Sequence, residues 1–180
     1  MSKSKNIFVG INLVGGLTVL SSYLFCFILY PTYSRSLWGS ASDQVIMFFV
    51  ISMFLAASGY VWFTFYLSKG TKLEDSGFVT IFGTKTINLL YLVVLVCSAI
   101  WMPASISFSM GENIFAELII RLVLWMVGLA SVGILICIYK ININHGKSSF
   151  ISHMFALLGA IVFTIHTLIL DAVIWPFLYF

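Results

Sequence analysis

Five long apolar runs, separated by short polar segments, form the hydrophobic pattern of this chain. The runs cover residues 7–30, 45–67, 86–102, 115–139 and 151–174. About 20 apolar residues in a helix span the hydrocarbon core of a bilayer, and every run except the third reaches that length comfortably. We expect the third run to take a turn from the residues before Lys85 or to cross a locally thinned bilayer. The pattern predicts an all-α fold, with residues 1–180 forming a single domain of five transmembrane helices.

The basic residues are distributed unevenly among the polar segments. Counted as alternating crossings, the first, third and fifth segments contain Lys3, Lys5, Lys69, Lys72, Lys85, Lys140 and Lys147. Arg35 lies in the second segment, and Arg121 lies near the start of the fourth run. Translocation discriminates against basic residues in short loops, so the lysine side is predicted to be cytoplasmic. The N-terminus is therefore expected in the cytoplasm and the C-terminus outside, in a multi-pass protein of a plasma or inner membrane.

Composition supports this class of protein. With 61% hydrophobic and 8% charged residues, the chain lacks the charge that a water-facing surface needs. The net charge of +3 is small, and no block of like charges indicates nucleic-acid binding. The lipid bilayer is the expected partner, with other membrane subunits or further copies of the chain as additional candidates.

The three prolines each lie just after a tyrosine or tryptophan, near the outer end of a predicted helix: Pro31, Pro103 and Pro176. Proline lacks an amide donor and disfavours helical geometry in the residue before it, so each is expected to end its helix. Residues 104–113 would then form an outer loop.

Small side chains indicate where the helices pack, because helices in lipid associate through small residues. On the second run they are Ser52, Ala56 and Gly59, which we interpret as a packing seam without chemistry. The last run carries a small and polar stripe made of His153, Ala156, Ala160, Thr164, Thr167 and Asp171. The opposite side of that run is aliphatic and aromatic, so the stripe is predicted to face the interior of the bundle.

Ionisable side chains inside the apolar runs are the main candidates for function. Each costs at least about 2.5 kcal/mol near the bilayer centre unless it is paired or solvated. The ionisable candidates for a ligand site or an ion pathway are Glu117, Arg121, His166 and Asp171. Two neutral residues near them, Trp101 and Thr167, are further candidates.

Depth and charge suggest how these side chains pair. Arg121 and Asp171 both fall in the outer half of the bundle, which predicts an ion pair between the fourth and fifth helices. Glu117 is the rival partner of Arg121, because residues four apart share a helix face. His166 lies about 140° from Asp171 around an α-helix, so no His–Asp dyad is predicted. Two interpretations remain open: a polar pocket that opens outward, or a structural ion pair that fixes the register of two helices.

The sequence lacks the familiar signatures of catalysis. It contains no zinc-protease, serine-hydrolase or glycine-rich phosphate-binding motif, and its cysteines lack the CxxC spacing. We therefore expect no metal or cofactor, and we favour a non-enzymatic role. The leading prediction is a small integral membrane protein that serves as a non-catalytic subunit or binds a lipophilic ligand. The alternatives are a small channel or transporter that uses the polar cluster and, after it, a membrane-embedded enzyme.

Overall fold

The structure, a computed structural model, describes residues 3–33, 35–69, 84–111, 114–141 and 147–180. The long helices are α1 (Lys3–Leu29), α2 (Asp43–Ser68), α5 (Thr84–Gly111) and α6 (Ile114–Tyr139). The last span consists of α7 (Lys147–Thr164), the π-helix η3 (Ile165–Ile174) and α8 (Trp175–Tyr179), which follow one another without a break. The described residues form an all-helical fold, with five helices long and apolar enough to cross a membrane.

The prolines correct two expected helix ends. Pro103 lies inside α5, which has 28 residues and continues to Gly111. Residues 104–111 are therefore helical and form no loop, while residues 112 and 113 lie outside the described part. In a membrane helix, neighbouring groups can satisfy the carbonyl that proline leaves free, so the helix continues past it. Pro176 occupies the first turn of α8, which proline tolerates. Pro31 alone follows a helix end, because α1 stops at Leu29.

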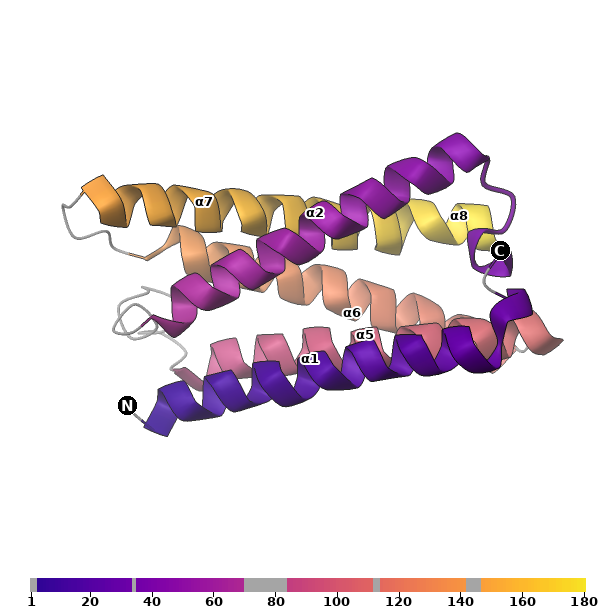
Figure 1. Ribbon diagram of the computed structural model, residues 1–180, viewed down its shortest axis with the longest axis horizontal. Coiled ribbons are helices and arrows are strands. Elements are labelled where there is room, and N and C mark those ends of the chain that lie inside the picture. The colour runs from indigo at the N-terminus through magenta and orange to yellow at the C-terminus, as the bar shows by residue number, and fades with distance from the viewer. Residues whose placement is uncertain (1–2, 34, 70–83, 112–113, 142–146) are drawn as a thin grey trace.

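The long helices pack as neighbours in the order α1, α5, α6, α7 and α2, so α1 and α2 lie at the two ends of this series. Helix α5 packs between α1 and α6, whereas α7 packs against α2 and α6. Consequently α1 and α2, although consecutive in the chain, make few contacts with each other. Figure 1 shows α2 crossing the bundle obliquely, close to α1 at the end where the chain begins. The two termini lie at opposite ends of the bundle, as five crossings require.

The two ends of the bundle differ in their residues. Lys69, Lys85 and Lys140 lie at helix ends on the side of the N-terminus, which we call the lysine end; Lys72 lies outside the described residues. At this end Phe8, Phe63 and Tyr91 are completely buried in one aromatic and aliphatic core cluster. The opposite end, where α8 lies, is called the C-terminal end.

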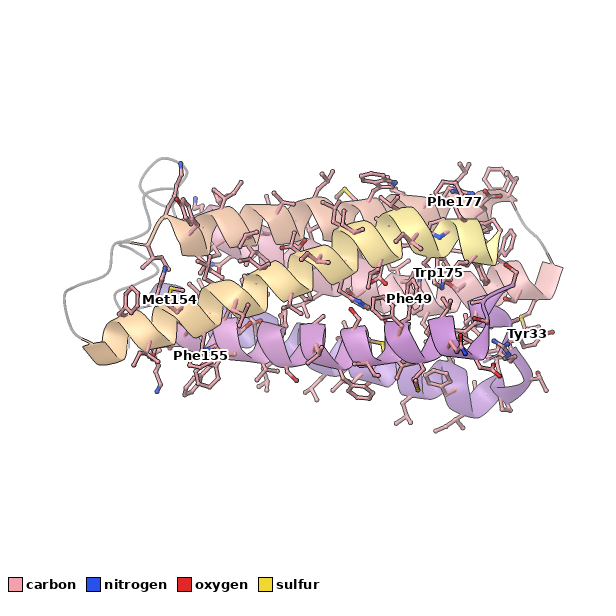
Figure 2. All side chains as sticks on the ribbon, turned by 90° about the horizontal axis from the view of Figure 1, so that it is seen from above. Tyr33, Phe49, Met154, Phe155, Trp175 and Phe177 are labelled. Atoms are coloured by element: carbon pink, nitrogen blue, oxygen red, sulfur yellow. The ribbon has the colours of Figure 1, made fainter. Side chains whose placement is uncertain are left out.

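Residues 175–180 close the C-terminal end and are called the C-terminal cap. Trp175 is 4% exposed, and its Nε1 donates a 3.0 Å hydrogen bond to the carbonyl oxygen of Leu37. Tyr179 stacks on Trp175 and donates its hydroxyl proton to the carbonyl oxygen of Ser105 at 2.7 Å. Figure 2 shows Trp175 and Phe49 at this end of the bundle; both are buried, whereas Phe177 is 84% exposed. The cap thus joins the last span to α5 and to the segment between α1 and α2.

Candidate functional site

A π-helical segment brings His166 and Asp171 together. The amide of Trp175 donates to the carbonyl of Leu170, five residues earlier, as the wider π turn requires. Residues five apart therefore stack on one face of η3, and His166 Nε2 lies 3.5 Å from Asp171 Oδ2. This contact is longer than an ordinary hydrogen bond and becomes an ion pair when the imidazole is protonated. The prediction that these two side chains could not form a dyad is therefore wrong, because it assumed α-helical geometry throughout.

Ser52 on α2 supplies the second partner of the histidine. Its Oγ lies 3.0 Å from His166 Nδ1, and the direction of this hydrogen bond depends on the imidazole tautomer. His166 is thus held on one side by a hydroxyl of α2 and on the other by a carboxyl group of its own helix. Ser52 lies on the seam that the sequence predicted, but it contributes a polar contact as well as a small side chain.

A second polar link joins the last span to α6. Thr167 Oγ1 donates to Ser131 Oγ at 2.9 Å and also lies 2.9 Å from the carbonyl oxygen of Phe163. Both side chains are buried, at 4% and 1% exposure. Thr164, one turn away, is also buried, and its hydroxyl has no hydrogen-bond partner among the described residues. The polar stripe of the last span therefore faces inward, as predicted.

Arg121 does not pair with Asp171. Its Nε and Nη2 lie 2.9 Å and 2.8 Å from Glu117 Oε1, one turn earlier on α6. The guanidinium also lies over the ring of Phe180, 4.4 Å from the ring centroid. These contacts are close to solvent or lipid, with 44% of the Arg121 side chain exposed. The predicted pair between α6 and the last span is therefore wrong, and the rival partner Glu117 holds the arginine.

Asp171 combines an inward position with accessible surface. Its neighbours His166, Thr167, Ala172 and Trp175 are all buried. Nevertheless, 30% of the Asp171 side chain remains accessible, compared with 9% of the His166 side chain. The Asp171 side chain is therefore partly accessible, whereas the imidazole is almost enclosed.

Aromatic side chains border this polar group toward the C-terminal end. Trp101 of α5 packs against Tyr23 of α1, with ring centroids 5.8 Å apart, and against Trp175, at 5.5 Å. The indole N–H of Trp101 is buried and has no hydrogen-bond acceptor among the described residues. Trp101 therefore belongs to a group of packed aromatic rings, with Tyr23 and Trp175, at the C-terminal cap.

The sequence-predicted candidates separate into two groups. His166, Asp171 and Thr167 lie on the inner side of η3, with Trp101 in the neighbouring group of aromatic rings. Arg121 and Glu117 form a separate pair on α6. Sequence reasoning missed the polar roles of Ser52 and Ser131, because serines in a small-residue stripe look the same whether they only pack or also bond. We call His166, Asp171 and Ser52 the polar triad.

The polar triad is a group of hydrogen-bonding side chains in which Ser52 and Asp171 contact opposite ring nitrogens of His166, and the Asp171 side chain remains partly accessible. Among the described residues, no group of three or more His, Cys, Asp or Glu side chains gathers as a metal site would need. No protein-family model, curated protein or solved structure matches this chain. The geometry of the polar triad is therefore the basis for proposing a function.

Proposed function

We propose that this chain is an integral membrane protein that binds a lipophilic molecule, with the polar triad as the site for its head group. The observation that carries the proposal is the His166–Asp171 contact within η3, with the Asp171 side chain still partly accessible. Ionisable side chains within membrane spans are rare and costly, and they commonly mark ligand, ion or proton sites. π-Helical turns are also frequent at functional sites, which supports the same assignment.

The proposed orientation places the lysine end in the cytoplasm. Lys69, Lys85 and Lys140 lie at that end, and basic residues are retained on the cytoplasmic side during insertion. The polar triad would then lie between mid-depth and the outer surface, and the C-terminal cap would face outward. A cysteine introduced at Ser40, in a background without the native cysteines, should react with an impermeant maleimide from outside intact cells. Reaction only after permeabilisation would reverse the orientation.

Binding can be tested with a photoactivatable, alkyne-tagged long-chain alcohol added to the purified protein in nanodiscs. The matched variants are Asp171→Asn and Glu117→Gln, because each replaces one carboxyl group by an amide of nearly the same shape. Asparagine keeps one acceptor oxygen and replaces the other by an NH2 group. Loss of the hydrogen bond to the replaced oxygen, worth about 0.5–1.5 kcal/mol, should lower the affinity of Asp171→Asn by roughly two- to tenfold. Glu117→Gln should bind like the wild type. Equal labelling of both variants and the wild type would contradict the proposal.

Proton-coupled transport is the second candidate function, and the same pair of side chains favours it. A histidine next to a carboxyl group inside a membrane span can pass a proton between them. Proteoliposomes with an internal pH-sensitive dye would detect it as acidification that depends on His166. Proton flux lost in His166→Gln would favour transport, and flux equal to that of empty liposomes would exclude it.

A further inference from the structure

A side-chain hydrogen bond joins α1 and α2, and the two helices diverge from there toward the C-terminal end (Figure 1). Tyr60 of α2 donates a 2.6 Å hydrogen bond to Asn12 Oδ1 of α1. Gly16 lies one turn further along α1 toward the C-terminal end, on the same face as Asn12. A Cβ atom added at Gly16 meets no atom of the described chain within 4 Å, so the space beside this glycine is open.

The facing side of α2 is open at the same level. Ala57 lies about one turn from Tyr60 toward the C-terminal end and is exposed. Met53, one turn further, is 42% exposed, although it shares the face of Tyr60. The next residue, Ser52, belongs to the polar triad. The open side of α2 therefore runs along Ala57 and Met53 up to the level of Ser52 and the polar triad.

At the C-terminal end, by contrast, hydrogen bonds join the described residues across the bundle. Trp175 is hydrogen-bonded to Leu37, and Tyr179 is hydrogen-bonded to Ser105 and lies 2.8 Å from the hydroxyl of Ser109. The amide of Ser40 donates a further 2.9 Å bond to the carbonyl oxygen of Leu178. The C-terminal cap is thus tied to α5 and to the segment between α1 and α2.

We propose that the ligand enters sideways from the bilayer, through a lateral portal between Gly16 of α1 and Ala57 and Met53 of α2. This inference rests on the proposed function and adds the route and the class of ligand. The sides of the portal are apolar and face lipid, so a hydrocarbon chain can remain in the bilayer or between the helices. The carboxyl group of Asp171 at its inner end exchanges hydrogen bonds best with a group that can both donate and accept, so it selects a hydroxyl head group. The ligand class is therefore a single-chain lipid with a small hydroxyl head group.

The portal can be closed at Gly16, where an added Cβ meets no atom of the described chain within 4 Å. Gly16→Phe places a ring in the open space, whereas Gly10→Phe is the matched control. Gly10 also has no atom of the described chain within 4 Å of an added Cβ, but it lies on the opposite side of α1 from Asn12. Ala57→Phe closes the portal from α2 and serves as the second variant if Gly16→Phe does not fold.

The experiment measures the labelling rate of the purified full chain in nanodiscs that contain the photoactivatable long-chain alcohol. The methyl ether of the same alcohol, which cannot donate a hydrogen bond, is the matched probe. We expect Gly16→Phe and Ala57→Phe to label at least tenfold more slowly than the wild type, and Gly10→Phe to label at the wild-type rate. The wild type should label more slowly with the ether than with the alcohol.

Each outcome distinguishes the portal from the site. Wild-type labelling rates in both portal variants, together with reduced labelling of Asp171→Asn, would overturn the portal and leave the proposed function intact. Equal labelling by the alcohol and the ether would overturn the ligand class. Wild-type labelling of Asp171→Asn as well as of the portal variants would overturn both the site and the portal.

Discussion

Gly59 of α2 and Gly159 of α7 bring two helix backbones into direct contact, two turns from Ser52 and His166 respectively. A Cβ atom added at Gly59 would lie 2.6 Å from the carbonyl oxygen of Gly159 and 2.9 Å from its Cα. Both are backbone atoms, so no side-chain rotation can relieve the overlap. Gly59→Ala should therefore push α2 away from α7 and lengthen the contact between Ser52 and His166.

The magnitude follows from the overlap. Adding a methyl group to a tightly packed interface costs about 1–3 kcal/mol, because the backbones must separate. Alanine also has a higher helix propensity than glycine, which offsets up to about 1 kcal/mol. Gly10→Ala, which adds the same methyl group in open space, carries only the propensity term. The difference in unfolding free energy between the two variants should therefore be about 1–3 kcal/mol.

Unfolding in mixed micelles of rising SDS fraction, followed by far-UV circular dichroism, measures this difference. Gly59→Ala should unfold at a clearly lower SDS fraction than Gly10→Ala. It should also bind the long-chain alcohol more weakly, because α2 carries Ser52 into the polar triad. If the two alanine variants unfold at the same SDS fraction, α2 and α7 do not meet at these glycines and the reasoning is refuted.

Three further outcomes follow from the side-chain contacts. Arg121→Ala and Asp171→Ala should be additive in unfolding free energy within about 0.5 kcal/mol, since the two residues have separate partners; a larger coupling in the double mutant would restore the pair between α6 and the last span. Thr167→Val should cost about 1 kcal/mol in the same unfolding assay, and less in a Ser131→Ala background, where only the hydrogen bond to the Phe163 carbonyl remains to be lost. Tyr179→Phe removes the hydroxyl that contacts α5 and should increase amide exchange in the C-terminal cap, while exchange at the lysine end stays unchanged.

The helices were predictable from the sequence because length and apolarity dominate in a membrane-spanning segment. Each predicted run overlaps an observed helix, and the small seam around Ala56 and Gly59 is buried against α7 as expected. The errors fell at Pro103 and Pro176, where a rule from soluble proteins was applied. A proline in lipid removes one hydrogen bond, but ending the helix there would expose further backbone groups to the bilayer.

The site was harder to predict, because it depends on a departure from α-helical geometry. His166 and Asp171 were both recognised as candidates, yet their contact requires the π-helical turn of η3. Nothing in the residues 165–174 distinguishes a π-helix from an α-helix by hydrophobic pattern alone. The pairing of Arg121 was equally undecided in the sequence, since Glu117 and Asp171 both lay at a suitable depth. Only the rotation of the helices decides between them.

Deletion of Ile165 or of Ile169 tests whether ligand binding depends on the π-helical turn of η3. Both are exposed isoleucines within η3, so neither deletion removes a core side chain. A segment that closes as an α-helix after deletion of Ile169 leaves His166 and Asp171 four positions apart, which stacks them on one face. Deletion of Ile165 leaves them five positions apart, about 140° around an α-helix. We therefore expect the Ile169 deletion to retain binding of the long-chain alcohol and the Ile165 deletion to lose it, although both remain folded by circular dichroism. Equal binding by the two deletion variants would show that the His–Asp contact is not what the ligand requires, because only the Ile169 deletion preserves this contact.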